Sequence, residues 1–213
     1  STGGSSGSDI GSKSLVGRFD YRYKDRYLFQ ATFRADGDVL FSETARWGYF
    51  PSFSAGWVLS KENFLKDNNT LNHLKLRLSY SESGDARANG LNGFDYLTGY
   101  GLSGSYLFDG ATSQAIRTLG LVNPDLTWEE ATSYNAGVEA NFFNNRLQLE
   151  ADVYYRERIN LLRPNIADIP STFGGDLPLV NLNTENNRGI DVKLNYLQTI
   201  GNFELNISPN FTY

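Results

Sequence analysis

The sequence predicts an all-β protein whose antiparallel, up-and-down strands form part of a transmembrane β-barrel with long loops on one side. Three observations predict this class: apolar and polar side chains alternate over long stretches, short and long connections alternate, and the apolar faces carry no charge. The clearest stretch covers residues 47–60, in which every second residue from Trp47 to Leu59 is apolar. The pattern lasts for about twelve residues, and a tilted strand needs roughly nine to eleven to cross a bilayer.

Eight such stretches follow one another along the chain. They cover residues 15–24, 27–36, 47–60, 73–80, 134–142, 147–156, 190–196 and 203–211. A tight turn at Lys24, Asp25 and Arg26 makes the first two a hairpin, and Asn144 and Asn145 form the turn between the fifth and sixth. Residues 1–12 are rich in Gly and Ser, which predicts a flexible loop or linker before the barrel residues 13–213.

The longest connections are predicted to lie together at one end of the strands. Connections 37–46, 84–132 and 158–187 alternate with 24–26, 60–71, 143–146 and 198–202. Outer-membrane barrels have this arrangement, with short periplasmic turns and longer extracellular loops. Within the longest loop, residues 96–106 have the pattern of a β-extension.

Charged side chains occupy the faces opposite the apolar rows. An Arg or Lys that faces mid-bilayer lipid costs about 2–4 kcal/mol, whereas a wide water-filled lumen accepts charge. We therefore expect the following residues to face the lumen: Arg18, Asp20, Arg34, Lys75, Arg77, Glu139, Glu150, Asp152, Asp191 and Lys193.

Composition narrows the possible classes further. The chain has 213 residues, no Cys, no Met and a net charge of −5. No run of about eighteen apolar residues predicts a membrane helix, and the lack of Cys excludes a disulfide framework. Mild acidity without a basic stripe argues against a nucleic-acid partner. Because the chain has neither a Met nor a signal peptide, we expect an internal fragment.

No residue constellation predicts catalysis. His73 stands alone, and Glu129 and Glu130 would point to opposite faces of a strand, so they cannot act as a carboxylate pair. The sequence Asp36-Gly37-Asp38 offers oxygens to calcium, yet Asp-Gly is primarily a turn signal. We expect no enzymatic activity, no cofactor and no bound metal.

Several sequence blocks together resemble one family. The blocks are RADG at 34–37, WGYFPS at 47–52, LKLRLSY at 74–80, NPDLTWE at 123–129, NNR at 144–146 and NRGI at 187–190. In this order, over nearly the whole chain, they resemble the barrel of SusC/RagA-type TonB-dependent outer-membrane transporters. The chain departs from the family pattern at 38–41, where serines are usual, and at 83–85, where Gly-Asn is more usual.

The resemblance implies that the eight strands are part of a barrel of about 22, as in outer-membrane transporters with a plugged lumen. It also implies outer-membrane lipid around the barrel and import of an oligosaccharide or a peptide. Coupling to TonB would use an N-terminal region that is missing from this fragment, and a SusD-like surface lipoprotein would cap the barrel.

The long loops are where a solute would first touch the protein. Their aromatic rings can stack on sugar faces, and their carboxylates can accept hydrogen bonds from hydroxyl groups. The candidate substrate-binding residues are Tyr96, Tyr100, Tyr106, Asp109, Trp128 and Phe173. The alternative is that these aromatic side chains pack the loops on one another. The NPDLTWE block is interpreted as the structured entry to the fifth strand rather than as a binding site.

Two other functions compete with active transport. A passive porin or adhesin barrel would have neither plug nor TonB-binding segment in the full-length sequence. A soluble all-β carbohydrate-binding protein would also alternate apolar and polar residues, and it would refold in buffer without detergent.

Overall fold

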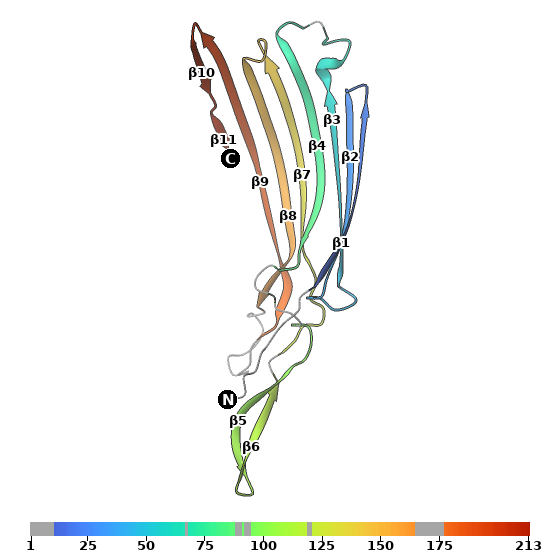
Figure 1. The fold of residues 1–213 in the computed structure, drawn as a ribbon, viewed down its shortest axis with the longest axis vertical. Helices are drawn as coiled ribbons and strands as arrows, with labels where there is room; N and C mark the ends of the chain where they lie inside the picture. The colour runs from blue at the N-terminus through green and yellow to red at the C-terminus, as the bar shows by residue number, and fades with distance from the viewer. Residues whose placement is uncertain (1–10, 67, 88–90, 92–94, 119–120, 165–176) are drawn as a thin grey trace.

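The structure, a computed structural model, describes residues 11–66, 68–87, 91, 95–118, 121–164 and 177–213. Within these ranges no helix has the length and apolar character to span a membrane. The strands form one nine-stranded sheet and one separate two-stranded sheet (Figure 1). The predicted all-β, antiparallel class is confirmed.

The large sheet runs up and down, with sequence neighbours side by side. Its strands are, in spatial order, β1 (Ser12–Tyr23), β2 (Tyr27–Asp38), β3 (Trp47–Val58), β4 (Leu71–Asp85), β7 (Glu129–Phe142), β8 (Leu147–Pro164) and β9 (Leu179–Ile200), with β10 (Phe203–Ile207) and β11 (Asn210–Thr212) both paired to β9. A short 3-10 helix, η1 (Leu59–Lys61), follows β3. β4 pairs with β7 because β5 (Tyr100–Phe108) and β6 (Ala111–Thr118) form a hairpin of their own.

Short turns close the sheet at one end. Lys24 and Asp25 have φ values of 49° and 51°, and Asn144 and Asn145 have 56° and 63°. Asn and Asp enter this left-handed region at lower energetic cost than other non-glycine residues. Both predicted turns are confirmed, and the long connections and the β5–β6 hairpin lie at the opposite end (Figure 1).

The two faces of the large sheet differ in chemistry, and we call them the apolar face and the charged face. Aromatic side chains of neighbouring strands meet on the apolar face in two rows and in the separate pair Phe33–Tyr49. The turn-side aromatic row contains Tyr23, Tyr27 and Trp57, and the loop-side aromatic row contains Phe53, Tyr80, Tyr134 and Tyr155.

The uncharged part of the apolar face has the length of a bilayer crossing. On β8 it covers 147–155 and ends before Glu157, and on β1 it covers 15–23 and ends at Lys13. Each of these windows is roughly nine residues long, which matches a tilted strand in a bilayer. β8 and β9 continue past the window. Glu157 lies on the same face beyond it, and Arg188 lies opposite Tyr155 at its edge.

The loop expected at 158–187 is wrong in extent, because β8 reaches Pro164 and β9 begins at Leu179. The alternation is interrupted where the register shifts near Asn160, which has a φ of 59°. Above the bilayer neither face of the hairpin needs to be apolar, so the sequence signal for a strand is lost there.

Three further boundaries differ from the prediction. Inside the loop expected at 84–132, the β-extension predicted at 96–106 is present as β5 but is shifted to Tyr100–Phe108 and paired with β6, and β7 begins as early as Glu129. The strand expected at 203–211 is divided at Pro209 into β10 and β11. Its register continues across the break, because Leu194 N donates to Pro209 O at 3.0 Å. Most of the predicted linker, residues 1–10, lies outside the described residues, so that assignment stays a prediction.

Candidate functional site

The charged face carries a network of ion pairs in the middle of the sheet. Glu139 on β7 lies 3.0 Å from Arg77 Nε and 3.4 Å from Lys75 Nζ, both on β4. Arg77 also reaches Asp152 on β8, with 2.9 Å between Nη2 and Oδ2. The network joins three strands, so it fixes charges of both signs at defined places on this face.

Glycine makes room for the ion pair between Arg77 and Asp152, which crosses β7. Arg77, Gly137 and Asp152 lie side by side on β4, β7 and β8. A Cβ added at Gly137 would lie 2.3 Å from Asp152 Oδ1 and 3.1 Å from Arg77 Nη2. The ion pair therefore crosses β7 because that position has no side chain.

The charged face is hollowed beside this network. An open trough of about 670 Å³ is lined by four cationic side chains and Asp20, by small polar residues, and by apolar side chains that include Tyr21, Phe29 and Leu78. Arg18 Nε pairs with Asp20 Oδ2 at 2.9 Å at one side of it, and Lys75 and Arg77 lie at the other. The trough therefore combines mostly cationic polar groups with apolar surface.

The strand register places all ten charged candidates on the charged face. Four of them lie on the last two long strands, where Glu150 is opposite Lys193 and Asp152 is opposite Asp191. Arg34 pairs with Asp36 at 2.5 Å near the loop end of β2. Their exposure to a lumen stays a prediction.

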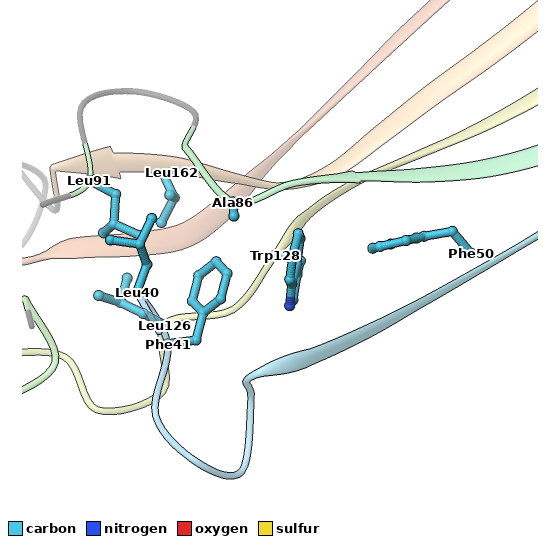
Figure 2. Close-up of a cluster of buried hydrophobic side chains, with 8 residues drawn as sticks. All are labelled: Leu40, Phe41, Phe50, Ala86, Leu91, Leu126, Trp128 and Leu162. Atoms are coloured by element: carbon cyan, nitrogen blue, oxygen red, sulfur yellow. The ribbon is translucent and has the colours of Figure 1, made fainter. Parts of the chain in front are cut away.

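A buried apolar cluster, which we call the rim cluster, packs the long loops against one another at the end of the sheet opposite the short turns (Figure 2). Its members come from three connections and the strand ends beside them: Leu40, Phe41, Phe50, Ala86, Leu91, Leu126, Trp128 and Leu162. Trp128 is 6 % exposed, and its ring lies 5.1 Å from Phe41 and 5.5 Å from Phe50 between ring centroids. Its indole N–H donates to Arg46 O at 3.3 Å.

Trp128 was expected to stack on a solute, and the structure corrects this expectation. Both of its ring neighbours are aromatic side chains of the protein, and almost none of its surface is open. For this residue the packing alternative holds, because a solute would have to displace Phe41 or Phe50.

Phe50 occupies a gap between β3 and β4. The pairing of these strands ends at Ser52 and Ser81, so they separate towards the loops. The Phe50 ring lies over two glycines, since a Cβ at Gly48 or Gly84 would lie 2.4 Å or 2.0 Å from Phe50 Cζ. The gap is thus filled by a ring, and the glycines are required for the ring to fit.

Hydrogen bonds attach the NPDLTWE block to the bulged part of β8 and β9. Asn181 Nδ2 donates to Thr127 O at 2.9 Å and to Asn160 O at 2.8 Å, and Thr127 N donates to Asn181 Oδ1 at 3.0 Å. As expected, this block is a structured entry to a strand, here β7. Asn181 was not among the predicted residues, because it lies in a region whose sequence resembles a loop.

Glu129 completes the attachment. Its side chain is buried, and it accepts hydrogen bonds from Leu162 N at 2.8 Å and from Arg158 Nη2 at 3.1 Å. A buried carboxylate is tolerated when charged and polar partners of this kind satisfy it. It holds the start of β7 against the far end of β8.

Three of the six loop candidates lie on the β5–β6 hairpin. Tyr100 and Tyr106 are 70 % and 53 % exposed, and Asp109 lies in the hairpin turn. A bulge at Gly104 reverses the facing of β5, so Tyr100 and Tyr106 point to opposite sides of the hairpin. Tyr96 is half-buried, and Phe173 lies outside the described residues. In the part of the chain that is described, no group of acidic and histidine side chains has the arrangement of a metal site.

These features together define a class of protein. An antiparallel sheet with one uncharged face of bilayer length, one charged face and long loops at a single end is a segment of an outer-membrane β-barrel. The profile of the family "TonB dependent receptor-like, beta-barrel" matches residues 2–213. The chain belongs to this family and is located in the outer membrane.

Known relatives cover nearly the whole chain. It is 34 % identical over 203 residues to the TonB-dependent receptor SusC of Bacteroides thetaiotaomicron. The aligned region covers 94 % of this chain and 20 % of that protein. It is 35 % identical over 202 residues to the TonB-dependent receptor P39 of Formosa agariphila, over 94 % of this chain and 18 % of that protein.

A solved structure of the RagAB peptide importer in the closed-closed state matches with a TM-score of 0.81 and 26 % identity, over 96 % of this chain and 22 % of that one. The chain therefore spans about a fifth of the length of its relatives. Since the family consists of receptors and transporters, the chain is not an enzyme, and the soluble carbohydrate-binding alternative is excluded.

Proposed function

We propose that the full-length protein actively imports an oligosaccharide or a peptide through the outer membrane, with energy supplied through TonB. The observation that carries this proposal is the separation of the two faces: ion pairs join β4, β7 and β8 on one face, and aromatic rows cover the other. In a closed barrel the charged face lines the lumen, where fixed charges of both signs contact polar cargo or polar protein segments.

The loop end is proposed as the entry for the cargo. The rim cluster and the Asn181 hydrogen bonds hold the loop bases rigidly, whereas the β5–β6 hairpin exposes Tyr100 and Tyr106 beyond them. Exposed tyrosines can stack on sugar rings or on peptide side chains. A SusD-like surface lipoprotein would approach the barrel from this side and retain the cargo, as the relationship to SusC and RagAB supports.

Uptake by cells that carry the full-length gene tests the proposal. A deletion strain complemented with this gene should accumulate labelled oligosaccharide or peptide from a defined set, and a protonophore should abolish the accumulation. Tyr106→Ala should lower uptake several-fold with unchanged protein in the membrane. Tyr196→Ala, on the apolar face at the other end of the sheet, is the matched control and should transport normally.

The passive barrel predicts a different result. Uptake that persists after the protonophore, and that does not depend on TonB, would support a porin-like function. No accumulation of any oligosaccharide or peptide in the set would argue against import of these two classes.

A further inference from the structure

The turn-side aromatic row ends the apolar face at a well-defined corner of the sheet. The ring of Tyr27 lies between those of Tyr23 and Trp57, with centroid distances of 6.4 Å and 6.3 Å. Amphipathic Tyr and Trp rings favour the level of the lipid headgroups. This row therefore marks where the hydrocarbon ends on β1, β2 and β3.

A carboxylate fixes the same level independently. Glu62, in the connection after η1, accepts hydrogen bonds from Tyr27 Oη at 2.8 Å, from Trp57 Nε1 at 3.1 Å and from Arg26 Nη1 at 3.1 Å. A carboxylate is too costly to place in hydrocarbon, so this group lies in the headgroup region. The polar ends of Tyr27 and Trp57 are thereby directed towards the headgroups, and their rings continue the apolar face.

Two lysines with weak or no acidic partners lie beside this row. Lys24 Nζ is 5.1 Å from the centroid of the Tyr23 ring, and among the described residues it has no acidic partner. Lys61 Nζ is 3.9 Å from Asp25 Oδ2, and Asp25 is shared with Arg22 at 3.7 Å. Arg26 and Glu62 neutralise one another, so the corner keeps surplus positive charge although the chain as a whole is acidic.

We propose that this corner binds the headgroup of an anionic phospholipid in the periplasmic leaflet. Lys24 and Lys61 contact the phosphate, while Tyr23, Tyr27 and Trp57 pack against the glycerol and the first part of the acyl chains. A lipid fits better than a protein partner because the corner continues directly into the uncharged window of the apolar face. The inference requires the outer-membrane location and does not depend on the proposed transport.

Retention of phosphatidylglycerol by the full-length protein tests the proposal. Native mass spectrometry of the protein released from detergent micelles counts bound lipids after addition of phosphatidylglycerol or of zwitterionic phosphatidylcholine. Wild-type protein should retain phosphatidylglycerol preferentially. Each lysine removed should weaken this binding about fivefold, which is the usual contribution of a basic side chain near an anionic lipid surface.

The variants are Lys24→Ala, Lys61→Ala and the double variant. Lys13→Ala is the matched control, because Lys13 lies on the same face of β1 as Tyr23 but at the opposite end of the strand. It should bind phosphatidylglycerol like the wild type, and thermal unfolding in detergent should show that all variants are folded. Equal retention of the two lipids by the wild type, unchanged binding in the double variant, or an equal loss in Lys13→Ala would each overturn the proposal.

Discussion

Arg77 on β4 and Asp152 on β8 form an ion pair across the strand that lies between them, with 2.9 Å from Nη2 to Oδ2. The pair exists because the intervening residue, Gly137, leaves the surface of β7 open. Both side chains are partly exposed, so the pair alone contributes modestly to stability. Its main consequence is geometric, because it fixes a guanidinium and a carboxylate on the charged face.

Replacement of this glycine should disturb the network. In Gly137→Ala the new methyl group would overlap Asp152 Oδ1, so the carboxylate and Arg77 must move apart. We expect a loss of at most about 1 kcal/mol in the free energy of unfolding, because both side chains are partly exposed and their ends can move away from the methyl group. Thermal unfolding of the full-length protein in detergent measures this loss. Gly17→Ala is the control, because a Cβ there has no neighbour within 4 Å; an equal effect of both changes would contradict the explanation.

The close packing of the Phe50 ring on Gly48 and Gly84 leads to a second prediction. Gly84→Ala places a methyl group within the volume of the Phe50 ring, which must then leave its site beside Trp128. The rim cluster should loosen, and trypsin should cut faster after Arg87, which lies just beyond Ala86. Proteolysis of the barrel in detergent, followed by mass spectrometry, measures the change.

A second substitution separates this mechanism from general destabilisation. Adding Phe50→Leu to Gly84→Ala removes the ring that clashes and should slow the cleavage again. Gly11→Ala, at a site with open space, should leave the cleavage rate unchanged. If the double variant is cut as fast as Gly84→Ala, the ring is not the cause.

The buried carboxylate of Glu129 supports a third prediction. Glu129→Ala removes the acceptor for Leu162 N and Arg158, and we expect a loss of about 1–3 kcal/mol in the free energy of unfolding. Glu129→Gln keeps an acceptor oxygen and should lose less. Hydrogen exchange at Leu162 reports the local effect. The neighbouring exposed Glu130 provides the control Glu130→Ala, which should leave this exchange unchanged.

The strands could be predicted from the sequence wherever one face must exclude charge. On β8, residues 147–155 alternate strictly because lipid on one side and water on the other impose different side chains. The same strand continues to Pro164, but past Glu157 both faces meet water, so nothing in the sequence requires alternation. The prediction accordingly ended near the bilayer boundary and not at the end of the strand.

The loop residues could not be assigned from composition alone. Trp128 and Tyr106 are both aromatic residues in one long connection, yet Trp128 is buried and Tyr106 is exposed. The difference arises because Trp128 immediately precedes β7, where Phe41 and Phe50 pack on its ring, whereas Tyr106 lies on the separate β5–β6 hairpin. Phe41 and Phe50 are more than 70 residues away from Trp128 in the sequence, so no local pattern reveals this contact.

The stability of the connection after η1 should depend on pH through Glu62. Hydrogen bonds from Tyr27 and from Trp57, with the nearby Arg26, lower the pKa of Glu62 below its ordinary value of 4.5. Because the folded-state pKa is the lower one, the carboxylate stabilises the turn above pH 4.5, and this contribution is lost as pH falls through the folded-state value. We therefore expect protection of amides in residues 59–66 to fall only below pH 4.5.

Hydrogen exchange of the full-length protein in detergent, corrected for the intrinsic effect of pH, measures this protection. In Glu62→Gln the side chain cannot titrate, so the protection should be weaker at neutral pH and independent of pH in the acidic range. Glu43→Gln, in a connection at the other end of the sheet, is the control and should behave like the wild type. A wild-type turn that loosens already between pH 7 and pH 5, or a Glu62→Gln variant that keeps the acid transition, would assign the effect to another group.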